Sequence, residues 1–143
     1  MKRSYFKIKP RKPLKKTKLH KKSKQKISVL QRRLWEECRR VAKKMYKNDC
    51  YTCPAKNLQG SNCQLGHLWA KASLGAFLKY DMRLLRWQCF RCNINFGGMG
   101  SDFYMRMWEE NGADYMNKLL ADRKVSVKAY DHYQKLLTEY QQI

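Results

Sequence analysis

The sequence predicts an α+β fold in which a small core lies between an N-terminal helix and a helical C-terminal tail. Apolar residues recur at three- and four-residue steps over residues 27–46, which indicates a helix of about five turns. Two short runs in the middle of the chain, 64–69 and 84–88, are typical of strands. After residue 100 the apolar spacing becomes helical again. A chain of 143 residues has room for one modest domain.

The first helix is predicted to bury one apolar stripe and to carry basic residues on its other faces. Ser28 is a candidate N-cap, with Ser23 as the alternative. Cys38 falls on the apolar stripe, and we interpret it as a small core residue.

The tail is predicted to contain three helices. The first covers residues 102–110 with Ser101 as its N-cap. Asn111 and Gly112 should break it, a second helix should follow over about 113–121, and a last one should begin at Ser126. The Tyr- and Leu-bearing last helix leaves two options open, an interface in a homodimer or packing within one chain.

The chain is strongly basic. Its 32 Lys and Arg outnumber 11 Asp and Glu, giving a formal net charge of +21, which predicts a polyanionic partner such as DNA or RNA. Residues 1–26 carry no acidic residue and are predicted to form a flexible basic arm before a single domain at 27–143. Lys15 and Lys16 of this arm are candidate phosphate contacts; the alternative is a solubilising tail.

Two Cys-x-x-Cys pairs give the strongest signal in the sequence, and their members are Cys50, Cys53, Cys89 and Cys92. Pairs with this spacing in a Lys-rich chain favour metal binding over disulfides. Zn²⁺ prefers four ligands in a tetrahedron, so we predict one structural zinc held by these four cysteines. Cys63 is not counted as a ligand.

No apolar run approaches the roughly 18 residues of a membrane span, and no apolar segment of a signal peptide follows Met1. The sequence therefore predicts a soluble, cytoplasmic protein with reduced thiols and no membrane partner.

A zinc ion with four thiolate ligands has no open position, so any catalysis must use other groups. His67 lies between the two cysteine pairs, and Asn93 directly follows the second. If the pairs close on one zinc ion, His67 should lie opposite Asn93. These two residues are the candidate catalytic site.

Several residues carry a resemblance to a known family. The chain has Gly66-His67 between the cysteine pairs, then Asp81-x-Arg83, Gln88-Cys-x-x-Cys-Asn93, Phe96 and the pair Gly97-Gly98. This pattern resembles the zinc-bound HNH, or ββα-metal, nucleases and in particular the NinG (Rap) recombination proteins of lambdoid phages. The resemblance covers about residues 27–143.

The resemblance implies a ββα-metal (HNH-like) core and a metal-dependent endonuclease that cuts branched DNA such as Holliday junctions and D-loops in a bacterial host cell. His67 would be the general base. Asn93 would bind a Mg²⁺ or Mn²⁺ ion, for which Asp81 is the nearest acid. Asp81 could instead fix Arg83. The candidate DNA contacts are Arg83, Arg86, Arg91, Arg39, Arg40 and Lys43.

Two other functions remain open on sequence grounds. Gln64 and Leu84 stand where the resemblance would place an acid and an asparagine, which favours a zinc-bound protein that binds DNA junctions, single strands or RNA without cutting them. A basic accessory protein of a larger nucleoprotein assembly is the third alternative.

Overall fold

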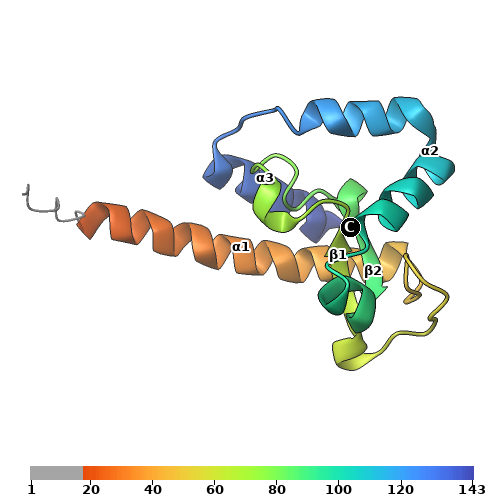
Figure 1. Ribbon diagram of the computed structural model, residues 1–143. Helices are drawn as coiled ribbons and strands as arrows, with labels where there is room; N and C mark the ends of the chain where they lie inside the picture. The colour runs from red at the N-terminus through yellow and green to blue at the C-terminus, as the bar shows by residue number, and fades with distance from the viewer. Residues whose placement is uncertain (1–17) are drawn as a thin grey trace, which may run out of the picture.

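The computed structural model describes residues 18–143, with side chains described from residue 26 onward. Three helices and a two-stranded sheet form a mixed α+β structure (Figure 1). The bounds of these elements are α1 Lys18–Met45, β1 Cys63–His67, β2 Leu85–Cys89, α2 Gly100–Asp122 and α3 Ala129–Gln142. The predicted fold class is confirmed at this level.

Helix α1 is longer than predicted, because it begins at Lys18 rather than near residue 27. Residues 18–26 lack Gly and Pro and consist largely of good helix formers, so the helix continues past the last packed turn. The predicted N-cap at Ser28, or at Ser23, is therefore wrong, since both lie inside the helix. Residues 1–17, with Lys15 and Lys16, lie outside the described residues.

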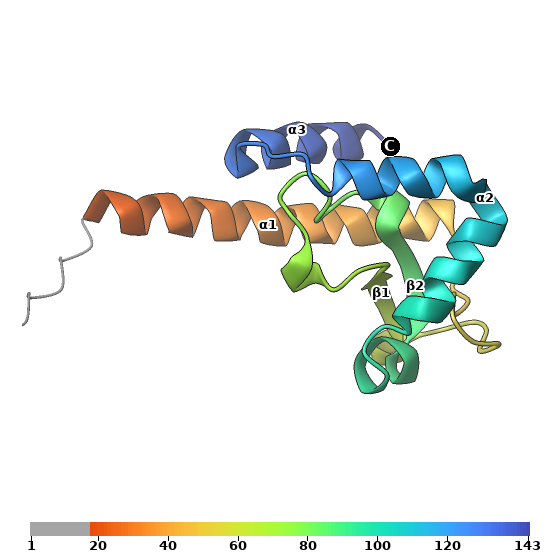
Figure 2. The same ribbon diagram turned by 45° about the horizontal axis from the view of Figure 1, so that its top comes forward.

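Helix α3 packs along α1, and the first turns of α1 project beyond the rest of the molecule (Figures 1 and 2). The apolar stripe of α1, including Leu34, Cys38 and Val41, is buried, as predicted for Cys38. Tyr133 and Tyr140 from α3 are buried in the same cluster. The apolar face of the last helix thus packs within the chain, and a homodimer stays a prediction.

The sheet is a single antiparallel pair, in which Cys63 pairs with Cys89 and His67 with Leu85. Both strands lie within one residue of their predicted start, and β1 ends two residues early. Trp87 of β2 is buried, and its indole N–H donates to the backbone oxygen of Ala42 in α1 at 3.3 Å. This contact fixes the sheet against the C-terminal part of α1.

A second apolar cluster lies between α2 and the segment that joins the two strands. Phe103, Met107 and Leu119 of α2 are buried there with Leu68 and Leu78. Gly112 has φ 82° and bends α2, where Asn111-Gly112 was predicted to break it. The N-cap of the helix is Met99 rather than Ser101, and α3 begins at Ala129 rather than Ser126, so these two predictions were wrong by two and three residues.

No helix among residues 18–143 combines the length and the apolar character needed to cross a membrane. The helices instead alternate buried and exposed positions along their length, as expected for elements that cover a core on one face.

Tyr140 provides a test of the packing between α3 and the core. Its hydroxyl donates to Tyr80 O at 2.8 Å and accepts from Met82 N at 3.3 Å. Tyr140→Phe removes the partner of the Met82 N–H and leaves Tyr80 O with only the Cys38 thiol at 3.6 Å, so we expect the free energy of unfolding to fall by about 1–3 kcal/mol in thermal or urea denaturation. Tyr130→Phe on the exposed side of α3 is the control, with an expected change within about 0.5 kcal/mol. Equal losses of stability in Tyr140→Phe and Tyr130→Phe would contradict the buried hydrogen bonds assigned to the Tyr140 hydroxyl.

Candidate functional site

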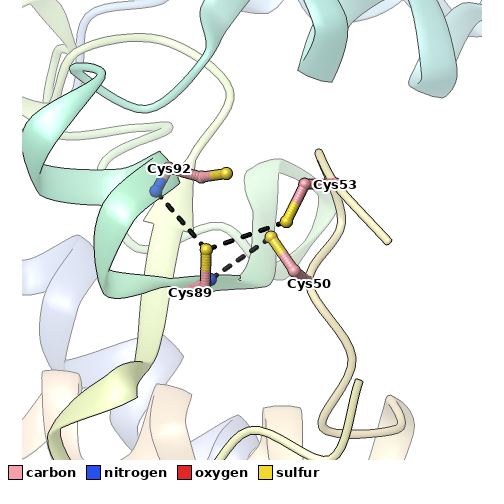
Figure 3. Close-up of side chains that lie close together, drawn as sticks. All are labelled: Cys50, Cys53, Cys89 and Cys92. Atoms are coloured by element: carbon pink, nitrogen blue, oxygen red, sulfur yellow. Dashed lines mark hydrogen bonds between the residues drawn. The ribbon is translucent and has the colours of Figure 1, made fainter. Parts of the chain in front are cut away.

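The four cysteines of the two Cys-x-x-Cys pairs come together. Cys50 and Cys53 lie in the loop after α1, Cys89 ends β2, and Cys92 follows in a turn of π-helix at Arg91–Asn95. Their sulfurs lie within 4.8 Å of one another. The four side chains point toward one common centre (Figure 3).

The spacing of the sulfurs fits zinc. Four sulfurs at about 2.3 Å from one Zn²⁺ stand about 3.8 Å apart in a regular tetrahedron. The sulfurs of Cys53 and Cys89 are 3.8 Å apart, and all six cysteines of the chain are free thiols. The cluster can therefore hold a structural metal ion such as zinc.

Hydrogen bonds to the sulfurs support the same conclusion. The Cys89 backbone N–H donates to Cys50 Sγ at 3.3 Å, and that of Cys92 donates to Cys89 Sγ at 3.5 Å. Burial opposes ionisation of Cys50, yet hydrogen bonds from the backbone and from Thr52 lower its pKa to about 6. Burial raises the pKa of Cys92 to about 12. A divalent cation at the centre favours the thiolate form of all four.

The two remaining cysteines lie outside the cluster. Cys38 is buried in α1 and donates to Tyr80 O at 3.6 Å, and burial raises its pKa to about 12. Cys63 starts β1, and burial raises its pKa as well. Neither cysteine belongs to the group of sulfurs that lie within 4.8 Å of one another.

His67 ends β1, and its ring is held in one orientation. The ring stacks on Trp35 of α1, with centroids 5.4 Å apart and planes 2° from parallel. Its Nε2 lies 3.0 Å from the backbone oxygen of Lys79. Because a carbonyl oxygen only accepts, Nε2 carries the proton and Nδ1 keeps its lone pair. The imidazole can therefore accept a proton at Nδ1.

The surroundings of His67 disfavour its charged form. Burial is the main cause, and the positive charges of Lys71 and Lys79 act in the same direction against the hydrogen bond to Lys79 O. Together they lower the pKa of His67 from 6.5 to about 4. The ring is neutral at physiological pH, which is the form that a general base requires.

His67 and Asn93 share one small pocket beside the cysteine cluster. The pocket has a volume of about 270 Å³. Its lining residues are His67, Leu68, Trp69, Ala70, Lys71, Asn93, Gly97, Gly98 and Gly100. The structure thus brings together the two residues that the sequence singled out.

The structure does not bring Asp81 to this pocket. Its carboxylate accepts from the Arg83 side chain at 2.6 to 3.1 Å and from the Arg83 backbone N–H at 2.9 Å. Asp122 binds the same guanidinium at 2.8 Å. Of the two roles open for Asp81, the structure supports the one in which it fixes Arg83. The Arg83 guanidinium forms ion pairs with two carboxylates, those of Asp81 and Asp122, and is therefore a poor candidate for binding a DNA phosphate.

The other arginines of the core differ in their availability. Arg86 donates to Tyr46 Oη at 2.9 Å and to Leu85 O at 2.8 Å, so it is held inside the structure. Arg91 is exposed and lies over the ring of Phe96, with its guanidinium carbon 4.9 Å from the centroid. Arg91 is the one of this pair that can reach a phosphate.

On α1 the predicted contacts are also unequal. Arg40 is paired with Glu37 at 2.6 Å and donates to Tyr140 O. Arg39 is half-buried over Trp87. Lys43 is exposed, together with Arg32, Arg33 and Lys44. The exposed side chains are the better candidates for contact with a polyanion.

Three residues of the site were missed by the sequence analysis. Trp35 was assigned only to the first helix, although an aromatic beside the apolar stripe could have indicated a stacking partner. Lys71 lies in a segment, 71–78, whose structure the sequence left open. Gln88 was noted only as part of a motif, and its burial beside Gly66 depends on pairing across the sheet.

The cluster of four cysteines leads to a prediction about metal content. We expect one zinc per purified chain by elemental analysis, and Cys89→Ser should lose it together with cooperative unfolding, because metal binding and folding are coupled in such sites. Cys63→Ala, in the same sheet, should keep the zinc. Full zinc retention by Cys89→Ser would show that these sulfurs do not hold it.

His67 leads to a prediction about pH. Because its pKa is lower in the folded chain (about 4) than its ordinary value of 6.5, the unfolded chain binds the proton more readily between these values. The free energy of unfolding should therefore decrease as the pH is lowered from about 6.5 to about 4, by up to about 1.4 kcal/mol per pH unit. His67→Phe should lack this slope in urea denaturation from pH 4 to 7. If the unfolding free energy of the wild type and of His67→Phe varied in the same way with pH, the lowered pKa of His67 would be contradicted.

Comparisons with known proteins add no name to this site. No family model matches the chain, and neither the curated proteins nor the solved structures give a match. The function is therefore inferred from three features of the chain itself. These are the cluster of four thiols, the neutral His67 beside it, and the strongly basic composition.

Proposed function

We propose that this chain is a metal-dependent endodeoxyribonuclease that cuts branched DNA, of the NinG type within the HNH, or ββα-metal, class. The observation that carries the proposal is the pocket shared by His67 and Asn93, with the proton of His67 fixed on Nε2. The pattern of cysteines and Asn93 in the sequence, and a net charge of +21, support it further.

His67 has the properties of a general base for water. Its Nδ1 lone pair takes a proton from a water molecule, whose oxygen attacks the phosphorus of a DNA phosphodiester. The bond from phosphorus to the leaving oxygen breaks, and that oxygen takes a proton from solvent. Trp35 and Lys79 O keep the ring in place during this transfer.

Asn93 has the oxygen that a hard cation prefers, and it lines the same pocket. A bound Mg²⁺ or Mn²⁺ would polarise the scissile phosphate and stabilise the leaving oxygen. Lys71, which also lines the pocket, attracts the phosphate as a point charge. A zinc ion held by Cys50, Cys53, Cys89 and Cys92 would have a structural role, because four thiolate ligands leave no open position.

DNA contacts outside the pocket are proposed for the exposed basic residues of α1 and for Arg91. Lysines and arginines that meet phosphates give affinity without sequence choice. This fits an enzyme that selects the shape of a branch rather than a base sequence. The steep salt dependence of such contacts applies equally to a protein that binds without cutting.

Binding without cleavage is the second candidate function, and one observation favours it. Among the residues that the structure describes, no carboxylate lines the pocket of His67 and Asn93. A hard divalent cation usually has at least one carboxylate ligand. Under this alternative the same basic surface holds a DNA junction, a single strand or RNA while other proteins act on it.

Cleavage of a four-way DNA junction with Mg²⁺ or Mn²⁺ tests the proposal. His67→Ala should lower the cleavage rate about 10²- to 10⁴-fold, the usual contribution of a positioned acid or base, with junction binding unchanged. His132→Ala is a matched control, because His132 also stacks on an aromatic ring and contacts a backbone oxygen through Nε2, at 3.1 Å. Binding without cleavage by the wild type would establish the second function, and equal rates for the two variants would exclude His67 as the base.

A further inference from the structure

Gln88 is a buried polar residue with no role in either the cysteine cluster or the His67 site described above. It lies on β2 directly before Cys89 and is 0% exposed. Among the described residues with an amide or charged side chain, it alone is buried. Its cross-strand partner Gln64 is half-buried at the surface of the same sheet. A buried amide requires partners for both of its polar atoms.

The nitrogen of Gln88 has two partners, and they fix the orientation of the amide. Nε2 donates to Thr52 Oγ1 at 2.9 Å and to Gly98 O at 2.8 Å. The Gly98 carbonyl oxygen can only accept, so the nitrogen must be the atom that faces it. Oε1 therefore points the other way, and within the described structure it has no hydrogen-bond partner.

Gly66 leaves room for this oxygen. A Cβ on Gly66 would lie 1.9 Å from Gln88 Oε1 and 3.1 Å from Asn93 Oδ1. A side chain at position 66 would force the Gln88 amide out of its hydrogen bonds to Thr52 and Gly98, and the amide oxygens of Gln88 and Asn93 both lie next to the glycine. The neighbouring residue on β1 is His67, and Asn93 lines the pocket with it.

We propose that Gln88 Oε1 and Asn93 Oδ1 together bind a hard divalent cation, Mg²⁺ or Mn²⁺, whose remaining ligands include phosphate oxygens of the bound DNA. The inference deepens the proposed nuclease function and rests on it for the identity of the phosphate. Gln88 supplies the second protein oxygen of a site in which Asp81 has no part, since Asp81 binds Arg83.

The charges around the proposed cation site indicate that phosphates of the DNA must supply some of the ligands. Two neutral amide oxygens do not compensate a double positive charge, and Lys71 at the pocket repels a bare cation. Mg²⁺ commonly completes its coordination with substrate phosphates and water. The cation should therefore bind weakly to the protein alone and much more tightly to the protein with DNA.

The test is Mn²⁺ binding, read from the electron paramagnetic resonance signal of free Mn²⁺. The zinc-loaded full chain is used in a His67→Ala background, so that the four-way junction stays intact, and the signal of junction alone is subtracted. We expect one Mn²⁺ site that is at least about tenfold tighter with junction than without. Gln88→Ala should weaken it about tenfold or more, the cost typical of lost metal-site partners, while Gln64→Ala, the matched glutamine on the opposite strand, should leave it unchanged.

Two further arms keep the test decisive if Gln88→Ala folds poorly. Asn93→Asp adds a charge and should make the Mn²⁺ site detectable without DNA. In the His67→Ala chain with both glutamines intact, Mn²⁺ added with junction should broaden the Gln88 side-chain amide signals in NMR spectra before those of Gln64. Equal Mn²⁺ affinity in the Gln88→Ala and Gln64→Ala proteins, or broadening of neither glutamine, would overturn the proposal and assign Oε1 to a buried water.

These measurements separate the two proposals. Mn²⁺ binding that depends on Gln88 in a protein that fails to cut any junction would preserve the cation site and overturn the nuclease. Cleavage that depends on His67 but is insensitive to Gln88→Ala, in a protein with normal zinc content, would preserve the nuclease and overturn this site.

Discussion

The four sulfurs of Cys50, Cys53, Cys89 and Cys92 are the contact on which the rest of the structure depends. They join the loop that follows α1 to the end of β2, beside the hydrogen bonds from Tyr51 N–H to Trp87 O at 2.8 Å and from Gln88 Nε2 to Thr52 Oγ1 at 2.9 Å. A two-stranded sheet is marginally stable by itself, and this one has only five residue pairs. A metal ion at one end and Trp87 packed on α1 at the middle would hold in place the sheet, which carries His67, and the turn Arg91–Asn95, which carries Asn93.

Much of the fold could be predicted because the signals were local. The 3.6-residue spacing of Leu30, Leu34 and Cys38 located α1, and the two cysteine pairs located the metal centre, since sulfur spacing follows from backbone geometry. Helix starts were less predictable. Residues 18–26 continue α1 without an apolar stripe, and Met99 caps α2 in a left-handed conformation, which no residue preference indicates.

The details of the site could not be predicted, because they depend on contacts across the sheet and between distant segments. The sequence offered Asp81 as both a metal ligand and a partner of Arg83, and only the folded chain shows its carboxylate on Arg83. Likewise, the sequence offered Gly66 only as part of a Gly-His pattern. In the folded chain it is the space that Gln88 Oε1 occupies, a relation that requires the register of β1 and β2.

The stacking of Trp35 on His67 connects two parts of the molecule that sequence alone would treat as separate. Trp35 belongs to α1, the helix that carries exposed basic residues and runs toward the basic N-terminal segment. The orientation of the imidazole is thus set by two segments outside β1, α1 through Trp35 and the connection between the strands through Lys79 O.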